Sequence, residues 1–193
     1  MAFCIYLTHP QVQIDPAVPV PDWGLSDIGQ ARAQLAAGLP WARAIKHVIS
    51  SAERKAIETA EIFTKSNSVP LTLIETLHEN DRSATGFLPP EEFEQVADQF
   101  FAKPDESVRG WEMAQAAQQR IVSGVQTCLA DIPTEDPVLF AGHGGVGTLL
   151  MCHLMAVSIS RSYDQPGGGG CWYRFNKPDL ISCLAGSLSW NRL

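Results

Sequence analysis

The chain has 193 residues, of which 45% are hydrophobic and 18% are charged, and its formal net charge is −7. This length predicts one domain over residues 1–193 with a sizeable core, and the composition excludes a disulfide-stabilised miniprotein and an intrinsically disordered chain. Because 14 Lys and Arg stand against 21 Asp and Glu without a basic run, we expect no nucleic-acid binding.

The first ten residues do not have the pattern of a targeting segment. They lack a basic region, and His9 and Pro10 interrupt the apolar stretch too early for a signal peptide. The longest apolar stretch, residues 146–157, contains His153 and is shorter than the ~20 residues of a membrane span. We therefore expect a cytoplasmic protein that does not bind membranes.

The amino-terminal half alternates between apolar runs and helical periodicity. The apolar run at residues 3–8 predicts a strand, since a proline follows closely and the residue before proline avoids the helical region. Ser26 has the position of a helix N-cap, and Leu35 lies on the apolar stripe expected for that helix. A strand, a helix and a strand are then expected over residues 46–50, 52–65 and 69–74.

The carboxyl-terminal half continues this alternation. Two prolines and two glutamates at residues 89–92 indicate a helix start, and another helix is expected over about residues 112–129. The fully apolar run at residues 138–141 predicts a buried strand, and the helix after it begins near Gly144. Two late strands are expected over residues 172–175 and 181–185.

Strands that alternate with helices predict an α/β fold with three layers, in which a mostly parallel central sheet has helices on both faces. No internal repeat or linker divides the chain, and residues 167–170 form a four-glycine loop. Ligands of such sheets bind beyond the carboxyl ends of the strands. The residues directly after each strand are therefore the candidates for a functional site.

Two histidines, His9 and His143, directly follow predicted strands. A single histidine in this position is more often structural, but two at separate carboxyl ends of a parallel sheet favour a shared site. His47, His78 and His153 lie within a strand, on a loop and in a helix, and we expect structural roles for them. The five cysteines, with no CxxC pair, are expected to be free thiols: Cys4, Cys128, Cys152, Cys171 and Cys183.

His143 lies in a glycine-rich strand-to-helix turn, residues 141–147. The N–H groups of a helix that starts at Gly144 form an anion site. Gly142, Gly144 and Gly147 also match the GxGxxG dinucleotide pattern. Only residues 148–193 follow, which is too short for a nucleotide-binding half with its acidic ribose-binding strand end. The anion site is therefore favoured.

Glu79 is the candidate carboxylate, in a loop after the third predicted strand. Surface loops often carry such charges, but beside two histidines a carboxyl group can donate the proton that a leaving alkoxide or phenoxide needs. A metal site built from His9, His143 and Glu79 is an alternative, although the close ligand spacing of such sites is absent. We expect no metal and no cofactor.

Five segments in chain order resemble the histidine phosphatase superfamily, the phosphoglycerate mutase-like proteins. The family's first strand ends in Arg-His-Gly, which is matched here by Thr-His-Pro at residues 8–10. Residues 25–29 match its Leu-Thr/Ser…Gly helix start, and residues 50–60 match its Ser-Ser-x-x-x-Arg-Ala-x-x-Thr-Ala segment. Residues 77–79 match its Leu-x-Glu, and residues 142–146 match its Ser/Gly-His-Gly-Gly-Val.

The resemblance implies a metal-independent phosphomonoester hydrolase of the histidine acid phosphatase type. His9 would attack phosphorus and form a phosphohistidine, while His143 and the helix start at Gly144 hold the phosphoryl oxygens. Glu79 would protonate the leaving oxygen and then activate water. The implied partner is a small phosphorylated substrate or inorganic phosphate. A mutase is less favoured, because residues 88–103 do not resemble the mutase inserts, and no oligomeric state is indicated.

Three residues depart from the family pattern. Thr8 and Lys55 replace arginines, so the planar bidentate fork is lost at both positions, and Pro10 replaces a glycine. Losing one charge-assisted hydrogen bond at the transition state lowers the rate by about tenfold to a hundredfold. We expect Arg54 or Arg82 to join Thr8, Lys55 and Gly144 in binding phosphate. If neither Arg54 nor Arg82 binds phosphate, the alternative is a catalytically impaired family member that acts as a phospho-ligand sensor or protein-interaction module.

Overall fold

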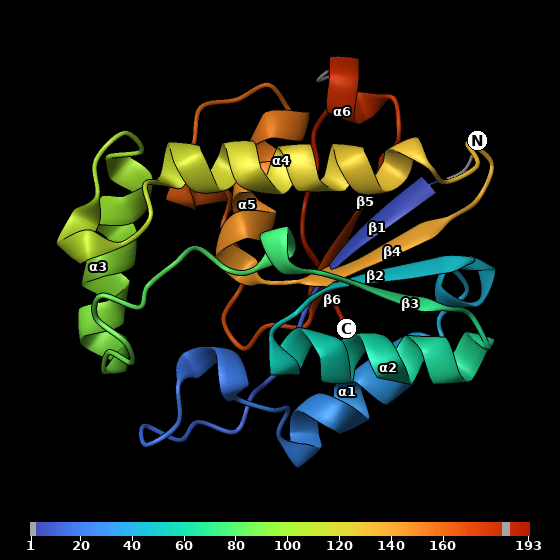
Figure 1. Cartoon of the computed structure of the whole chain (residues 1–193), viewed down its shortest axis with the longest axis horizontal. Coiled ribbons are helices and arrows are strands. Elements are labelled where there is room, and N and C mark those ends of the chain that lie inside the picture. Colours follow the sequence, from blue (N-terminus) through green and yellow to red (C-terminus); the bar gives the residue numbers. More distant parts are fainter. Residues whose placement is uncertain (1–2, 183–185) are drawn as a thin grey trace.

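The computed structural model describes residues 3–182 and 186–193, which form a six-stranded sheet with helices on both faces (Figure 1). The strand order is β3-β2-β4-β1-β5-β6. β3, β2, β4 and β1 are parallel to one another, whereas β5 and β6 are antiparallel to their neighbours. The strands are β1 (Phe3–Thr8), β2 (His47–Ser51), β3 (Leu71–Ile74), β4 (Val138–Gly142), β5 (Cys171–Asn176) and β6 (Asn191–Arg192). The predicted α/β fold with a mostly parallel sheet is confirmed.

The helices form two layers, with α1 and α2 on one face of the sheet and α4 and α5 on the other (Figure 1). α3 lies beyond one end of the sheet, beside the site described below. Short 3-10 turns lie in several of the connections. The helices are α1 (Asp27–Ala37), α2 (Arg54–Asn67), α3 (Pro90–Ala102), α4 (Ala114–Ala130), α5 (Gly144–Leu154) and α6 (Asp179–Ser182).

β1 is buried on both faces, as expected for a strand inside a two-sided sheet. Its side chains alternate, so that Tyr6 joins the core shared with α4 and α5, whereas Ile5 and Leu7 join the core shared with α1 and α2. Gly142 and Gly147 make room for the Tyr6 side chain, since a Cβ would lie 2.4 Å from its hydroxyl oxygen at Gly142 and 2.4 Å from its ring at Gly147. These glycines of the GxGxxG pattern therefore accommodate a tyrosine. The next strand, β5, is antiparallel to β1, unlike the parallel strands of a dinucleotide-binding unit.

Two sequence predictions about elements are wrong. Leu35 does not lie on the buried stripe of α1 and is 78% exposed, because that helix packs through small residues, Ala33 and Ala36 among them. The late strand expected over residues 181–185 is instead helical at residues 181–182, and residues 183–185 lie outside the described part. The Asp179 carboxylate accepts the N–H of Asn176 at 2.7 Å, which ends β5 and starts α6.

Four cysteines, Cys4, Cys128, Cys152 and Cys171, are free thiols, and Cys183 lies outside the described residues. Within residues 3–182 and 186–193, no helix combines the length and the apolar character that crossing a membrane requires.

The carboxyl ends of β1, β2 and β4 meet at one edge of the sheet. The chain leaves β1 for α1 on one face and leaves β4 for α5 on the other, which opens a crevice between the two strands. Thr8 and Gly142 pair at this edge, and the N–H of His9 donates to the Gly142 carbonyl at 2.9 Å. His143 follows Gly142 directly, so the sheet register brings the two candidate histidines together.

Candidate active site

His9 presents a neutral imidazole with one free nitrogen. Its Nδ1 lies 2.9 Å from the Pro10 carbonyl oxygen, and because a carbonyl only accepts, Nδ1 carries the hydrogen and Nε2 carries the lone pair. Burial, helped by the charges of His143 and Lys55, lowers the pKa of His9 to about 3. Pro10 therefore keeps the contact that sets this tautomer, although it replaces a glycine of the family pattern.

His143 is fully buried beside His9, with the ring centroids 5.4 Å apart at 67°. Its Nε2 lies 2.8 Å from Ser51 Oγ and 3.5 Å from Glu53 Oε1. Its Nδ1 has no hydrogen-bond partner among the described residues. Burial lowers the pKa of His143. The ring therefore holds one polar nitrogen without a partner, beside His9.

Glu79 reaches the same place from the loop after β3. Its carboxylate accepts the N–H groups of Gly145 at 3.1 Å and Val146 at 3.0 Å, in the first turn of α5. Burial raises the pKa of Glu79, but the charges of His143 and Arg82 and the Val146 N–H outweigh it and hold the pKa below its usual value. Part of the helix start predicted to bind phosphate is therefore occupied by the predicted acid.

Arg120, which the sequence did not single out, fixes the Glu79 loop from α4. Its guanidinium donates to the carbonyl oxygens of Thr76 at 2.8 Å, His78 at 3.0 Å and Glu79 at 3.3 Å. Its charge is paired with Glu112 at 2.7 Å. Because these contacts link a helix to a loop far away in the chain, no local pattern in the sequence could have indicated them.

Glu53 is a second carboxylate that the sequence analysis missed. One of its oxygens accepts the Glu79 N–H at 2.8 Å, and the other is paired with the Lys55 ammonium. Burial raises the pKa of Glu53, but His143 and Lys55 outweigh it and lower that pKa to about 2. Its position just after β2, inside the segment that resembles the family, was the one available signal.

Two of the predicted phosphate-binding side chains already have protein partners. The Thr8 hydroxyl accepts the Cys171 N–H at 2.9 Å and donates to Gln165 Oε1 at 2.6 Å. Lys55 is 2% exposed and donates to the Val20 carbonyl at 2.9 Å and to Glu53. Neither side chain is free to bind phosphate as the family's arginines would.

Arg54 and Arg82 differ in their relation to the site. Arg54 is on the outer side of α2, where it pairs with Glu58 at 2.7 Å, and it lines neither cavity beside the histidines. Arg82 lines both cavities and lies over the rings of Phe93 at 5.1 Å and Trp111 at 5.6 Å. Of the two arginines predicted to compensate, the structure places Arg82 in the site and Arg54 outside it.

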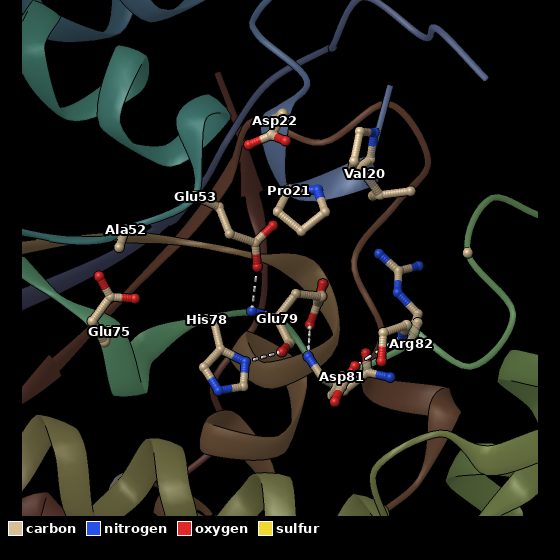
Figure 2. Close-up of a pocket in the computed structure, with 14 residues that line it drawn as sticks. Val20, Pro21, Asp22, Ala52, Glu53, Glu75, His78, Glu79, Asp81 and Arg82 are labelled. Carbon is tan, nitrogen blue, oxygen red and sulfur yellow. Dashed lines mark hydrogen bonds between the residues drawn. The ribbon is translucent and has the colours of Figure 1, made fainter. Parts of the chain in front are cut away.

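Two cavities meet at Glu79, Asn80 and Arg82. The smaller, of about 370 Å³, is lined by His9, the start of α5, α3 and the glycine loop. The larger, of about 540 Å³, lies between η1 (Val20–Asp22), the start of α2 and residues 78–86 (Figure 2). The arrangement offers one place for a group attacked by His9 and adjoining space for the rest of a ligand.

Gln165 lies over the start of α5, and the sequence analysis missed this residue also. A Cβ added at Gly144 would lie 2.3 Å from Gln165 Nε2, so this amide group covers Gly144 directly. Its Oε1 is held by the Thr8 hydroxyl. The amide nitrogen is therefore oriented by Thr8 at the edge of the smaller cavity, which Gln165 lines.

The glycine loop closes over the backbone of His9. Gly170 donates its N–H to the His9 carbonyl at 2.9 Å, and Arg32 holds the loop by donating to the carbonyls of Gly168 and Gly169, each at 2.8 Å. Gly169 has a φ of +59°, and a Cβ there would lie 2.3 Å from the His9 carbonyl oxygen. This position therefore requires glycine for both reasons.

Replacing Gly169 with alanine is expected to lower the free energy of unfolding by about 2 kcal/mol, because the methyl group overlaps a backbone oxygen at positive φ. Urea denaturation measures this difference. Gly167→Ala is the matched control, since a Cβ there meets nothing within 4 Å, and it should change the free energy by less than about 0.5 kcal/mol. Equal effects of the two variants would contradict the close approach to His9.

Across residues 3–182 and 186–193, no group of three or more His, Cys, Asp or Glu side chains has an arrangement suited to a metal ion. The alternative metal site of His9, His143 and Glu79 therefore has no support from the geometry. Three histidines remain. His47 is bound to Asp136 at 2.9 Å, His78 lines only the larger cavity of the two, and Nε2 of His153 lies 3.2 Å from the Leu180 carbonyl oxygen.

Comparison with known proteins agrees with this fold. Among solved structures, the chain is similar to mycobacterial glucosyl-3-phosphoglycerate phosphatase in complex with VO3, with a TM-score of 0.77 and 18% identity over 99% of this chain and 97% of that chain. It is also similar to YhfR of Bacillus stearothermophilus, with a TM-score of 0.73 and 19% identity over 90% of each chain. For a putative alpha-ribazole-5'-P phosphatase of Escherichia coli, the TM-score is 0.66 and the identity 18% over 90% of each chain.

A search of curated proteins gave no match. The sequence does match the model of the histidine phosphatase superfamily (branch 1) over residues 12–176, which is most of the chain and begins just after His9. The chain therefore belongs to the histidine phosphatase superfamily.

Proposed function

We propose that this protein is a metal-independent phosphomonoester hydrolase that acts through a phosphohistidine on His9. The observation that carries the proposal is the state of His9, whose Nδ1 donates to the Pro10 carbonyl while its Nε2 keeps the lone pair beside His143. Phosphate binding by the mycobacterial structural neighbour, which is described in complex with inorganic phosphate, agrees with this proposal.

In the first step, Nε2 of His9 attacks phosphorus, and the bond from phosphorus to the leaving oxygen breaks. Glu79 supplies the proton that the leaving oxygen needs, after binding of the phosphate anion has raised the pKa of its carboxyl group. In the second step, Glu79 accepts a proton from water, water attacks phosphorus, and the P–N bond to His9 breaks. His9 and Glu79 return to the states that they have in the substrate complex, Glu79 loses its proton when phosphate leaves, and no metal takes part.

Donors around the smaller cavity would hold the phosphoryl oxygens. When Nε2 of His143 accepts the Ser51 hydroxyl, its Nδ1 carries the hydrogen and can donate to one of them. The amide nitrogen of Gln165 is oriented toward the same region by Thr8. Arg82 supplies a positive charge, and no carboxylate among the described residues forms an ion pair with it. Neutral donors and one cation thus replace the two arginines of the family pattern.

A second candidate is a protein that binds a phosphorylated ligand without turning it over. The Lys55 ammonium is neutralised by Glu53, and the Thr8 hydroxyl is occupied by Cys171 and Gln165, so neither contributes charge to the transition state. Under this alternative, phosphate would bind and no phosphohistidine would form.

The test is hydrolysis of p-nitrophenyl phosphate with and without EDTA. We expect turnover that EDTA does not change, and we expect Arg82→Leu to lower kcat/KM by about tenfold to a hundredfold, because one charge-assisted contact is lost. Arg54→Leu is the matched control and should leave kcat/KM unchanged, since Arg54 is exposed, pairs with Glu58 and lines neither cavity. Loss of activity in EDTA would contradict the proposal, and equal effects of both arginine variants would contradict the role of Arg82.

A further inference from the structure

The larger cavity has an excess of negative charge. Five carboxylates line it, opposed by one guanidinium, that of Arg82 (Figure 2). The carboxylates are those of Asp22, Glu53, Glu75, Glu79 and Asp81. Because the cavity adjoins the place where His9 would attack, its charge acts directly on the part of a substrate that leaves.

These carboxylates form an inner and an outer group. The inner pair is engaged, since Glu53 is paired with Lys55 and Glu79 accepts two N–H groups of α5. The outer three, Asp22, Glu75 and Asp81, are exposed, and none of them has an ion-pair partner within the part of the chain that the structure describes. The mouth of the cavity therefore carries uncompensated negative charge.

Asn80 lies at the junction of the two cavities, where a ligand would enter the negative electrostatic field of the larger one. It is 6% exposed and lines both cavities, and its Nδ2 has no hydrogen-bond partner among residues 3–182 and 186–193. A buried amide N–H₂ without an acceptor is costly, and a phosphoryl oxygen at the junction of the cavities would supply one. The junction thus favours an anionic group, whereas the larger cavity beyond it favours a cation.

We infer that the substrate is a phosphomonoester of an amino alcohol, with its phosphoryl group at His9 and Asn80 and its ammonium group among the carboxylates of the larger cavity. The position of the phosphoryl group in this inference rests on the proposed function. The same carboxylates disfavour leaving groups that carry a carboxylate or a second phosphate, because like charges within one cavity repel.

Binding to His9→Ala tests the inference without dependence on turnover. Three ligands share a three-carbon chain and differ in charge at its end: 3-aminopropyl phosphate, propyl phosphate and 2-carboxyethyl phosphate. Calorimetry should give a Kd for the cationic ligand about tenfold or more below that for the anionic one, with propyl phosphate between them. Raising the salt concentration should reduce this ratio, since the outer carboxylates are exposed.

Charge-neutral variants locate the effect. Asp22→Asn with Glu75→Gln should reduce the Kd ratio to less than about threefold. Asp131→Asn with Glu135→Gln is the matched control, because it removes the same charge from exposed positions just ahead of β4, at the opposite end of the strands, and the ratio should stay unchanged.

Equal Kd values for the three ligands, or a ratio that survives the Asp22 and Glu75 changes, would overturn the inference. The proposed function stands or falls separately on hydrolysis of p-nitrophenyl phosphate by the wild-type protein. Hydrolysis without charge preference in binding would leave the hydrolase proposal intact and refute the amino-alcohol substrate. Charge preference in binding without hydrolysis would refute the hydrolase proposal and leave the preference for an amino-alcohol phosphate intact.

Discussion

Replacing His9 with alanine is expected to lower kcat for p-nitrophenyl phosphate on the order of 10⁴-fold, because the variant lacks the nitrogen that attacks phosphorus. Steady-state kinetics at saturating substrate measures this loss. The affinity for inorganic phosphate should change far less, since His143, Gln165 and Arg82 remain.

His47→Ala is the matched control for a lost histidine. His47 lies at the start of β2, at the opposite end of the strands, and is bound to Asp136. Its replacement should leave kcat within about twofold of the wild-type value, even if stability falls by about 1 kcal/mol. A His9→Ala protein that is folded and keeps wild-type turnover would show that His9 is not the nucleophile.

Replacing Glu79 with glutamine is expected to separate the two steps of the reaction. Formation of the phosphohistidine from p-nitrophenyl phosphate needs no proton on its good leaving group, so a burst of one equivalent of p-nitrophenol should persist. Steady-state turnover should fall on the order of 10³-fold, because the attacking water has lost its base. The amide oxygen still accepts an N–H group of α5, so the fold is retained.

Propyl phosphate gives the complementary result for the same variant. Its alkoxide cannot leave without a proton, so Glu79→Gln should show no burst with this substrate. In the wild-type protein, kcat/KM for propyl phosphate should fall as pH rises above about 6, because the proton needed by the leaving group is lost when the substrate monoanion and Glu79 are both ionised. The low pKa of His9 keeps its lone pair available down to about pH 3. A rate that rises through pH 8 would contradict this assignment.

The sequence predicted the parts of the site that depend on strand ends. His9 and His143 follow β1 and β4, and the parallel pairing of these strands places them side by side. Glu79 was predicted from its place in the loop after the third strand and from the family's Leu-x-Glu, and the structure brings it against the first turn of α5. Such residues are predictable because sheet topology converts sequence position directly into spatial position.

Side-chain partners could not be predicted in the same way. The link from Thr8 to Gln165 joins β1 to a loop before β5, and Arg120 reaches the Glu79 loop from α4. No pattern in the sequence indicates that Glu53 pairs with Lys55, yet folding buries the pair beside His143. These contacts depend on tertiary packing, which leaves no periodicity in the sequence.

Errors in the predicted elements have related physical causes. Leu35 looked like a core residue because apolar periodicity does not distinguish a large exposed side chain from a buried one, whereas α1 buries alanines instead. The segment at residues 181–182 looked like a strand by composition, but the Asp179 carboxylate turns the chain into a helix at the end of β5.

Rapid quenching of Glu79→Gln mixed with p-nitrophenyl phosphate is the most direct measurement. The phosphohydrolase mechanism predicts close to one equivalent of acid-labile phosphate per chain, located on His9 by peptide mapping and absent when His9→Ala is added to the same variant. A burst of p-nitrophenol without labelled protein, or label on a residue other than His9, would contradict it.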